Sequence, residues 1–263
     1  MTRTTARRRS PIAGIALMLV ALVVTGFAYS AVAGFSGTAD AAQSATTDQI
    51  DSGKRLYLES CSSCHGLAAE GTLNGPTLIG VGAAAVSFQV GTGRMPAAAP
   101  QQQVPKKPAK FTDEEVSDLA AYVGSLAPGP AIPTAEELDY EDADLALGGS
   151  LFRTNCAQCH NVSGQGGALS EGGYAPNITQ VSPQHLYEAM LTGPQNMPVF
   201  GNGTLRVEDK QAIIKYVRTI ADAPDPGGAS LGRVGPVTEG IVAWVVGLGA
   251  LIGAAVWIGV KAS

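Results

Sequence analysis

Cys61-Ser62-Ser63-Cys64-His65 is the stretch that organises this chain, and it recurs as Cys156-Ala157-Gln158-Cys159-His160. Each copy is a complete C-x-x-C-H motif, in which two thiols lie three positions apart and a histidine follows directly. Thiols at this spacing can add to the two vinyl groups at one edge of a haem, and the histidine is then held beneath the iron as an axial ligand. The two copies therefore predict two covalently attached haem c groups.

Other uses of paired cysteines fit this sequence less well. A zinc site needs four ligands that converge from paired motifs, whereas each cysteine pair here already has its own histidine. A thioredoxin-like redox motif needs no histidine after the second cysteine. A disulfide framework would need further cysteines, but the two motifs use all four that the chain contains.

The correspondence between the two halves extends beyond these motifs. Thr92-Gly93-Arg94-Met95-Pro96 in the first half matches Thr192-Gly193-Pro194-Gln195-Asn196-Met197-Pro198 in the second. Residues 115–123 and 209–217 then form matching segments that both end in Tyr-Val and predict a closing helix. The order of C-x-x-C-H motif, Met-Pro pair and closing helix thus occurs twice.

This repeated order resembles tandem cytochrome c domains of the class with one histidine and one methionine on each iron. The resemblance implies a mainly α fold, with a first haem domain at residues 47–126 and a second at residues 143–224. A composition of 33 Gly, 16 Pro and only 6% aromatic residues also favours small modules over one large core.

The resemblance further implies which groups hold the two haems. The thioether bonds would come from Cys61, Cys64, Cys156 and Cys159. The axial iron ligands would be His65, Met95, His160 and Met197. The carbonyls of Pro76 and Pro176 would accept the Nδ1–H of the two histidines, and such a bond fixes the ring and raises its basicity. A thioether ligand favours Fe(II) and raises the potential above that of a haem with two histidines.

Two residues compete with Met197 for the second iron. Met190 lies nearby, but no proline follows it and it does not match the position of Met95 in the repeat. His185 is the only histidine outside the two motifs and has no equivalent in the first half, so we expect it to be a structural or surface residue.

Residues 1–36 predict a membrane segment. Residues 1–9 contain four arginines and no acid, and residues 10–39 carry no charge. The apolar stretch is longer than the core of a signal peptide and long enough to cross a bilayer as a helix, although Ala31-Val32-Ala33 leaves a cleaved signal peptide as the alternative. In both cases we expect the arginines in the cytoplasm and the following residues outside it.

A second spanning helix is predicted at residues 239–261, after a linker at residues 225–238. Residues 240–260 carry no charge, have Trp244 and Trp257 near their ends, and are followed by Lys261. We therefore expect a multi-pass protein of the cell membrane with both termini in the cytoplasm and the haem domains on the extracytoplasmic side.

Two further segments show no core pattern of their own. Residues 97–109 are Pro/Gln-rich, and we expect them to wrap the first domain or to contact a partner. Residues 127–142 are a Pro/Gly-rich and acidic linker, for which a solvated hinge is favoured over a docking patch.

The expected exported part is strongly acidic. Removing the four N-terminal arginines and Lys261 from the 17 basic residues leaves 12 against 22 acids, a balance of −10. We therefore do not expect it to bind nucleic acid.

The whole chain, including residues 88–96, resembles the dihaem cytochrome c subunits of actinobacterial cytochrome bcc menaquinol oxidoreductases. The resemblance implies three partners besides membrane lipid: a cytochrome b subunit, a Rieske iron–sulfur subunit and the copper-centre subunit of a terminal oxidase. It implies that electrons pass from the Rieske protein through both haems to the oxidase, in a quinol–cytochrome c oxidoreductase complex. The chain itself would have no substrate site.

Other functions remain open from the residues alone. Two irons with six ligands each favour electron transfer over catalysis at the haem. An electron-acceptor subunit of a dehydrogenase or of another oxidase could also contain two tandem haem domains. A dihaem peroxidase is a further alternative, and it would need one iron with an open position.

Overall fold

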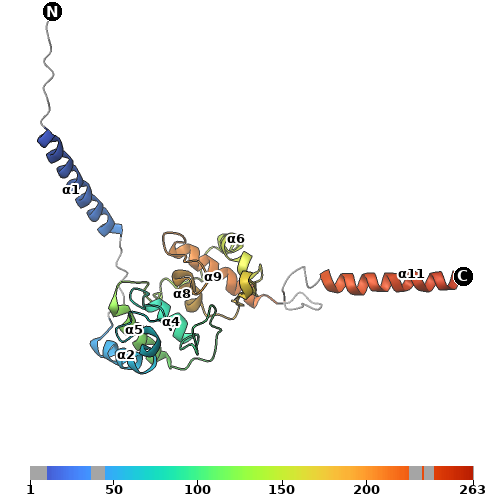
Figure 1. Cartoon of the computed structure of the whole chain (residues 1–263). Coiled ribbons are helices and arrows are strands. Elements are labelled where there is room, and N and C mark those ends of the chain that lie inside the picture. The colour runs from blue at the N-terminus through green and yellow to red at the C-terminus, as the bar shows by residue number, and fades with distance from the viewer. Residues whose placement is uncertain (1–10, 37–44, 225–232, 234–239, 263) are drawn as a thin grey trace, which may run out of the picture. The chain divides into compact units, whose positions relative to one another are not determined.

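The computed structural model describes residues 11–36, 45–224, 233 and 240–262, and the chain divides into two units, Met1–Ser44 and Ala45–Ser263 (Figure 1). Among its described residues, the first unit contains one helix, α1 (Pro11–Ser36). The predicted cytoplasmic arginines of residues 1–9 and nearly all of the linker at residues 225–238 lie outside the described residues.

The two predicted spanning helices differ in outcome. In the described part of the chain, one helix, Gly240–Lys261, is long and apolar enough to cross a membrane, which confirms the C-terminal candidate by length and composition. It contains a π-helical stretch, η3 (Ala243–Leu248), followed by α11 (Gly249–Ala262). The apolar stretch found within α1 is Gly14–Phe27. This stretch covers only the part of α1 whose side chains are described, and it is shorter than the roughly 20 residues that a spanning helix needs, so the N-terminal span is not confirmed.

The first haem domain is built from four helices. These are α2 (Thr47–Ser60), α3 (Ser62–His65), α4 (Ala83–Gly91) and α5 (Asp113–Leu126). Thr112 caps α5 by accepting from the backbone N–H of Glu115, and the Glu115 carboxylate accepts from the backbone N–H of Thr112. This is the capping box that the sequence Thr-Asp-Glu-Glu predicts, and it satisfies two N–H groups that a helix start otherwise leaves unpaired.

The second haem domain repeats this plan with an added hairpin. Its helices are α6 (Leu145–Asn155), α7 (Ala157–His160), α8 (Pro183–Thr192) and α9 (Val207–Asp222). A short antiparallel pair, β1 (Gly167–Ala168) with β2 (Tyr174–Ala175), encloses the 3-10 turn η1 (Ser170–Gly172). Ser182 caps α8 and Pro183 begins it, as the Ser-Pro pair predicts.

The same helix crossing forms the core of each domain. Helix α2 packs on α5 in the first domain, and α6 packs on α9 in the second. The ring centroids of Tyr57 and Tyr122 lie 5.2 Å apart at the first crossing, and those of Phe152 and Tyr216 lie 5.2 Å apart at the second. The repeat seen in the sequence is thus a repeat of packing as well.

Glycines make both crossings possible. A Cβ placed on Gly53 of α2 would overlap the carbonyl oxygen of Asp118 in α5, and one on Gly148 of α6 would overlap the carbonyl oxygen of Ala212 in α9. Only a residue without a side chain lets the two backbones approach this closely. Each core therefore depends on one glycine whose place in the repeat is the same.

The two haem domains contact each other through equivalent helices. Helix α4 of the first domain packs against α8 of the second, and each of these helices leads into its domain's Met-Pro loop. The ring of His185 in α8 meets the ring of Phe88 in α4 edge to face, with centroids 6.0 Å apart. This arrangement brings the two Met-Pro loops to the same interface.

The acidic linker packs on the second domain. Leu138 and Tyr140 contact the hydrophobic core of that domain. The Glu137 carboxylate accepts a hydrogen bond from the hydroxyl of Tyr187 at 3.0 Å, and the Glu136 carbonyl accepts from Nε2 of Gln211 at 2.8 Å. The prediction of a solvated hinge is therefore wrong for this part of the linker, because its apolar side chains and carbonyls have partners on α8 and α9.

Candidate functional site

The first C-x-x-C-H motif lies where α2 ends and the single turn of α3 begins. The backbone N–H of Cys61 still donates to the carbonyl of Tyr57 at 2.8 Å, while the next turn presents Cys64 and His65. The Tyr57 hydroxyl donates to the carbonyl of Gly66 at 2.6 Å and fixes the end of that turn. The core of the domain thus sets the direction of the motif.

The imidazole of His65 is held as the sequence predicts. Its Nδ1 lies 2.8 Å from the carbonyl oxygen of Pro76, so Nδ1 carries the proton in this contact, and in the neutral form of such a ring the lone pair is on Nε2. A histidine in this tautomer can bind a metal through Nε2.

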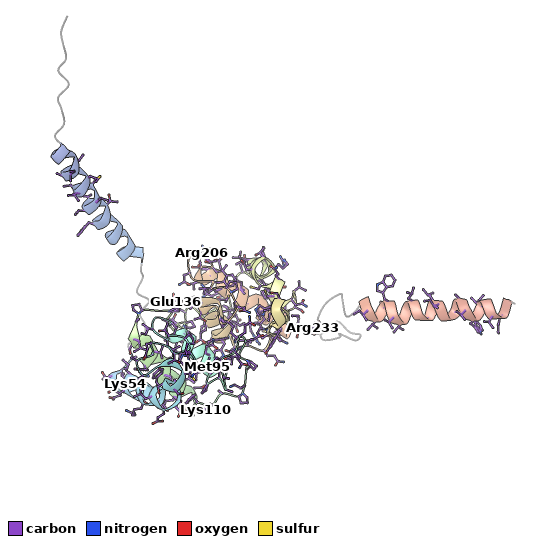
Figure 2. All side chains as sticks on the ribbon, viewed as in Figure 1. Lys54, Met95, Lys110, Glu136, Arg206 and Arg233 are labelled. Carbon is purple, nitrogen blue, oxygen red and sulfur yellow. The ribbon has the colours of Figure 1, made fainter. Side chains whose placement is uncertain are left out.

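Met95 shares a cavity with this motif. Its backbone N–H donates to the carbonyl of Gln89 at 2.9 Å, and Gly93 makes the turn before it with a φ of +70°. The cavity measures about 390 Å³ and is lined by both cysteines of the first motif, His65, Pro76 and Met95. Figure 2 shows Met95 within the first haem domain. The structure therefore brings the predicted residues of the first site together.

The second motif is positioned in the same way, with a longer loop. The Nδ1 of His160 lies 3.0 Å from the carbonyl oxygen of Pro176, which directly follows the β1–β2 pair. Burial lowers the pKa of His160, which favours the neutral ring that can bind a metal. The Gly-rich insertion is taken up by the hairpin, and Pro176 keeps the place expected for it.

The four thiols are unpaired and partly shielded. All of them lie within the described residues, and none forms a disulfide. Burial raises the pKa of Cys61, and it raises the pKa of Cys156 to about 11.

The second cavity contains Met197 and both of its competitors. It measures about 580 Å³, and its lining includes His160, Met197, Met190 and His185. Met190 is only 4% exposed and belongs to the hydrophobic core of the domain, whereas Met197 lies on the loop that follows the left-handed Gly193. Gly93 is the left-handed residue at the matching place in the first domain. This equivalence favours Met197 as the counterpart of Met95.

His185 is a residue of the domain interface. Its side chain is 26% exposed, and its Nε2 lies 3.8 Å from the Glu188 carboxylate. Glu188 is fully buried, and its Oε1 accepts from Nε2 of Gln184 at 2.9 Å. Burial raises the pKa of Glu188 to about 7, and burial also lowers the pKa of His185. The expectation of a structural role for His185 agrees with its packing against Phe88 and Glu188.

Residues of the first domain line the second cavity, which motif spacing did not predict. They come from α4, from the Met-Pro loop and from the Pro/Gln-rich segment: Phe88, Thr92, Arg94, Gln103, Val104 and Lys106. Residue pairs far apart in the sequence hold this segment in place. Gln103 bonds both the N–H and the carbonyl of Tyr174, and Nε2 of Gln195 donates to the Val104 carbonyl at 3.0 Å.

Val104 is the residue that the two cavities share. Its side chain is buried, and it lines the first cavity as well as the second. The Pro/Gln-rich segment therefore lies between the two sites and contacts the second domain of the same chain. Its unusual composition was the only sign in the sequence of this position.

The residues present fit a haem c at each site. Each cavity combines two free thiols, an imidazole whose Nδ1 faces a carbonyl, and at least one thioether sulfur, in a mostly apolar lining. Thiols supply the covalent bonds, and imidazole with thioether is a ligand pair that haem iron accepts.

Comparison with known proteins agrees with this chemistry. Residues 50–127 match the family described as "Cytochrome c", and residues 143–217 match the family described as "Cytochrome C oxidase, cbb3-type, subunit III". Two cytochrome c domains indicate that the chain carries two haem c groups.

Similar proteins from three actinobacteria extend the match to nearly the whole chain. A Mycobacterium tuberculosis protein is 42% identical over 98% of this chain and 94% of its own length. A Mycobacterium leprae protein is 43% identical over 94% of this chain and 87% of its own length. A Corynebacterium efficiens protein is 44% identical over 80% of this chain and 76% of its own length. Each is named cytochrome bc1 complex cytochrome c subunit. With this identity over both haem domains, the chain belongs to the family of cytochrome bc1 complex cytochrome c subunits.

Proposed function

We propose that this chain is the electron-carrying subunit of a membrane-bound quinol–cytochrome c oxidoreductase complex. In this proposal the first haem domain receives electrons from a Rieske iron–sulfur protein, and the second delivers them to the copper centre of a terminal oxidase. A cytochrome b subunit completes the complex. Bound haem c supplies a one-electron Fe(III)/Fe(II) couple at each site.

The observation that carries the proposal is the pairing of an imidazole and a thioether in each cavity. We assign His65 with Met95, and His160 with Met197, as the axial ligands, and the four motif cysteines as the covalent attachments. A protein that fills both axial positions leaves the iron no place for substrate, which suits electron transfer rather than peroxide chemistry.

The domain interface supports transfer within the chain. Helices α4 and α8 pack together, and Val104 lines both cavities, so the two sites are neighbours.

We also propose that the haem domains are extracytoplasmic and that both termini are cytoplasmic. The apolar helix Gly240–Lys261 supports anchoring at the C-terminal end. The four arginines before the apolar N-terminal stretch support a cytoplasmic N-terminus.

Purification of the tagged chain from membranes in mild detergent tests the complex. Reduced-minus-oxidised spectra of the eluate should show haem b beside haem c, with haem a if the oxidase stays attached. Mass spectrometry should identify a cytochrome b subunit and a Rieske protein. An eluate with haem c alone, or with a dehydrogenase as the partner, would contradict the assignment to this complex.

A further inference from the structure

The lining of the second cavity is asymmetric in charge. No Asp or Glu is present among the described residues that line it, whereas Arg94 and Lys106 are, and both belong to the first domain. The first cavity has neither an acidic side chain nor a lysine or arginine among its described lining residues. The second site alone therefore receives full positive charges, and it receives them from the neighbouring domain.

Arg94 is partly buried without a carboxylate partner. Its Nη1 donates to the Thr92 hydroxyl at 2.7 Å, and its guanidinium carbon lies 4.8 Å from the centre of the Phe88 ring. Among the ion pairs of the described residues, none involves Arg94. The side chain of Arg94 is half-buried, so its charged group has lost part of its hydration. A guanidinium in this situation is stabilised by an anion with two oxygens.

Haem c is itself a dicarboxylate. Its thioether edge is fixed at Cys156 and Cys159, and its two propionates lie at the opposite edge of the macrocycle. The cavity that must accept these carboxylates contains cations from the first domain and no acid that would repel them. We propose that Arg94, assisted by Lys106, binds a propionate of the second haem across the domain interface and so positions that haem and sets its potential.

The position of Arg94 in the sequence links the two haem sites. Arg94 directly precedes Met95, so the loop that supplies the thioether of the first site also supplies the cation of the second. The matching loop of the second domain has Pro194, Gln195 and Asn196 before Met197, and no cation. Its Gln195 instead bonds the Val104 carbonyl. The loop of the first domain thus reaches the second cavity and brings a charge to it, whereas no described residue of the second loop lines the first cavity.

Redox titration of the full-length protein in its detergent-solubilised complex tests the proposal. A cation beside the propionates favours the reduced haem, so Arg94→Gln should lower the potential of the second haem. We expect the equilibrium between the two haems to shift by about tenfold against the second, which is 59 mV for a one-electron couple. Arg94→Lys keeps the charge, so the potential of the second haem should stay close to that of the unsubstituted protein.

Lys107→Gln is the matched control. The Nζ of Lys107 donates to the carbonyl of Pro96 at 2.8 Å, so this residue contacts the same Met-Pro loop but does not line the second cavity. Its loss removes an equal charge without changing the lining of the second cavity, so it should leave the potential of the second haem unchanged. Equal shifts from both variants, or a shift of the first haem alone in Arg94→Gln, would overturn the proposal.

The proposal rests on the haem ligation proposed above, and a marker variant separates the two. Met197→His should strongly lower the reduction potential of one haem, which identifies that haem as the second. If neither potential falls, the proposed ligation is wrong. If Met197→His lowers one haem and Arg94→Gln leaves that haem unchanged, only the role of Arg94 is wrong. If Arg94→Gln fails to retain haem, Lys106→Gln replaces it as the test, because Lys106 is exposed. Lys106→Gln must then lower the potential of the second haem while the protein keeps two haems per chain.

Discussion

At the scale of single residues, two backbone carbonyls orient the rings of the two motif histidines. Pro76 and Pro176 orient His65 and His160 at 2.8 and 3.0 Å, although the loops between motif and proline differ in length by five residues, being 10 and 15 residues long. A carbonyl acceptor selects the tautomer whose Nε2 is free to bind iron. The structure thus keeps the orienting contact constant while the intervening loop varies.

Replacing Met197 by His should change the reduction potential of one haem only. Two imidazoles stabilise Fe(III) more than imidazole with thioether, so the potential should fall by on the order of 0.1 V, within the roughly 0.8 V that axial ligands can span. The other haem should stay nearly constant, as a redox titration followed in the visible spectrum would show.

Met190→Leu is the control for this ligand assignment. The substitution conserves volume in the core around Met190 and should leave both potentials and the Met–Fe(III) absorption band in place. Loss of that band in Met190→Leu, with a normal band in Met197→His, would show that Met190 is the ligand instead.

At the scale of secondary-structure elements, each haem domain depends on one helix crossing. Gly53 and Gly148 let α2 meet α5 and α6 meet α9 with their backbones in contact. The C-x-x-C-H turn follows directly from the C-terminal end of α2 or α6, so the crossing that forms the core also aims the thiols and the histidine. Stability and site geometry therefore have the same origin in both halves.

Gly148→Ala should destabilise the second domain. Its Cβ would overlap the Ala212 carbonyl, so α6 and α9 must move apart, and overpacking of this kind costs about 1–3 kcal/mol. Denaturant unfolding of the full-length protein, followed by the haem absorption, measures the loss of free energy.

Gly201→Ala is the control in the same domain. No heavy atom lies within 4 Å of its added Cβ, so the free energy of unfolding should change by less than about 0.5 kcal/mol. Equal losses in the two variants would mean that the helix crossing is not the cause.

At the scale of the whole molecule, two haem domains form one body within residues 45–263, and a helix suited to a membrane ends the described chain. The domains are joined through α4 and α8, through the Pro/Gln-rich segment and through the packed acidic linker. These contacts hold the two cavities next to each other, which suits the proposed transfer of electrons between them.

A reporter joined to the C-terminus should be active only in the cytoplasm. A fluorescent protein that matures there should be bright, and a phosphatase that needs export should be inactive, because Lys261 follows the apolar helix. The matched fusion after residue 224, before that helix, should give the opposite pattern. An exported reporter in the full-length fusion would overturn the proposed orientation.

The sequence by itself determined the chemistry and the modular plan of this protein. Two C-x-x-C-H motifs, two Met-Pro pairs, two closing helices and the cap at Thr112 are local patterns, and local patterns follow from covalent spacing and backbone hydrogen bonding. The residues predicted for each site line the same cavity in the structure.

Only the tertiary structure decided how the two sites are related. Arg94 lines a cavity whose cysteines lie more than sixty residues away, and Val104 separates two sites that spacing treats as independent. Such contacts arise from the packing of α4 on α8, which buries side chains that no periodic pattern marks. For the same reason the acidic linker, although polar by composition, packs on the second domain, because its few apolar side chains contact the core of that domain.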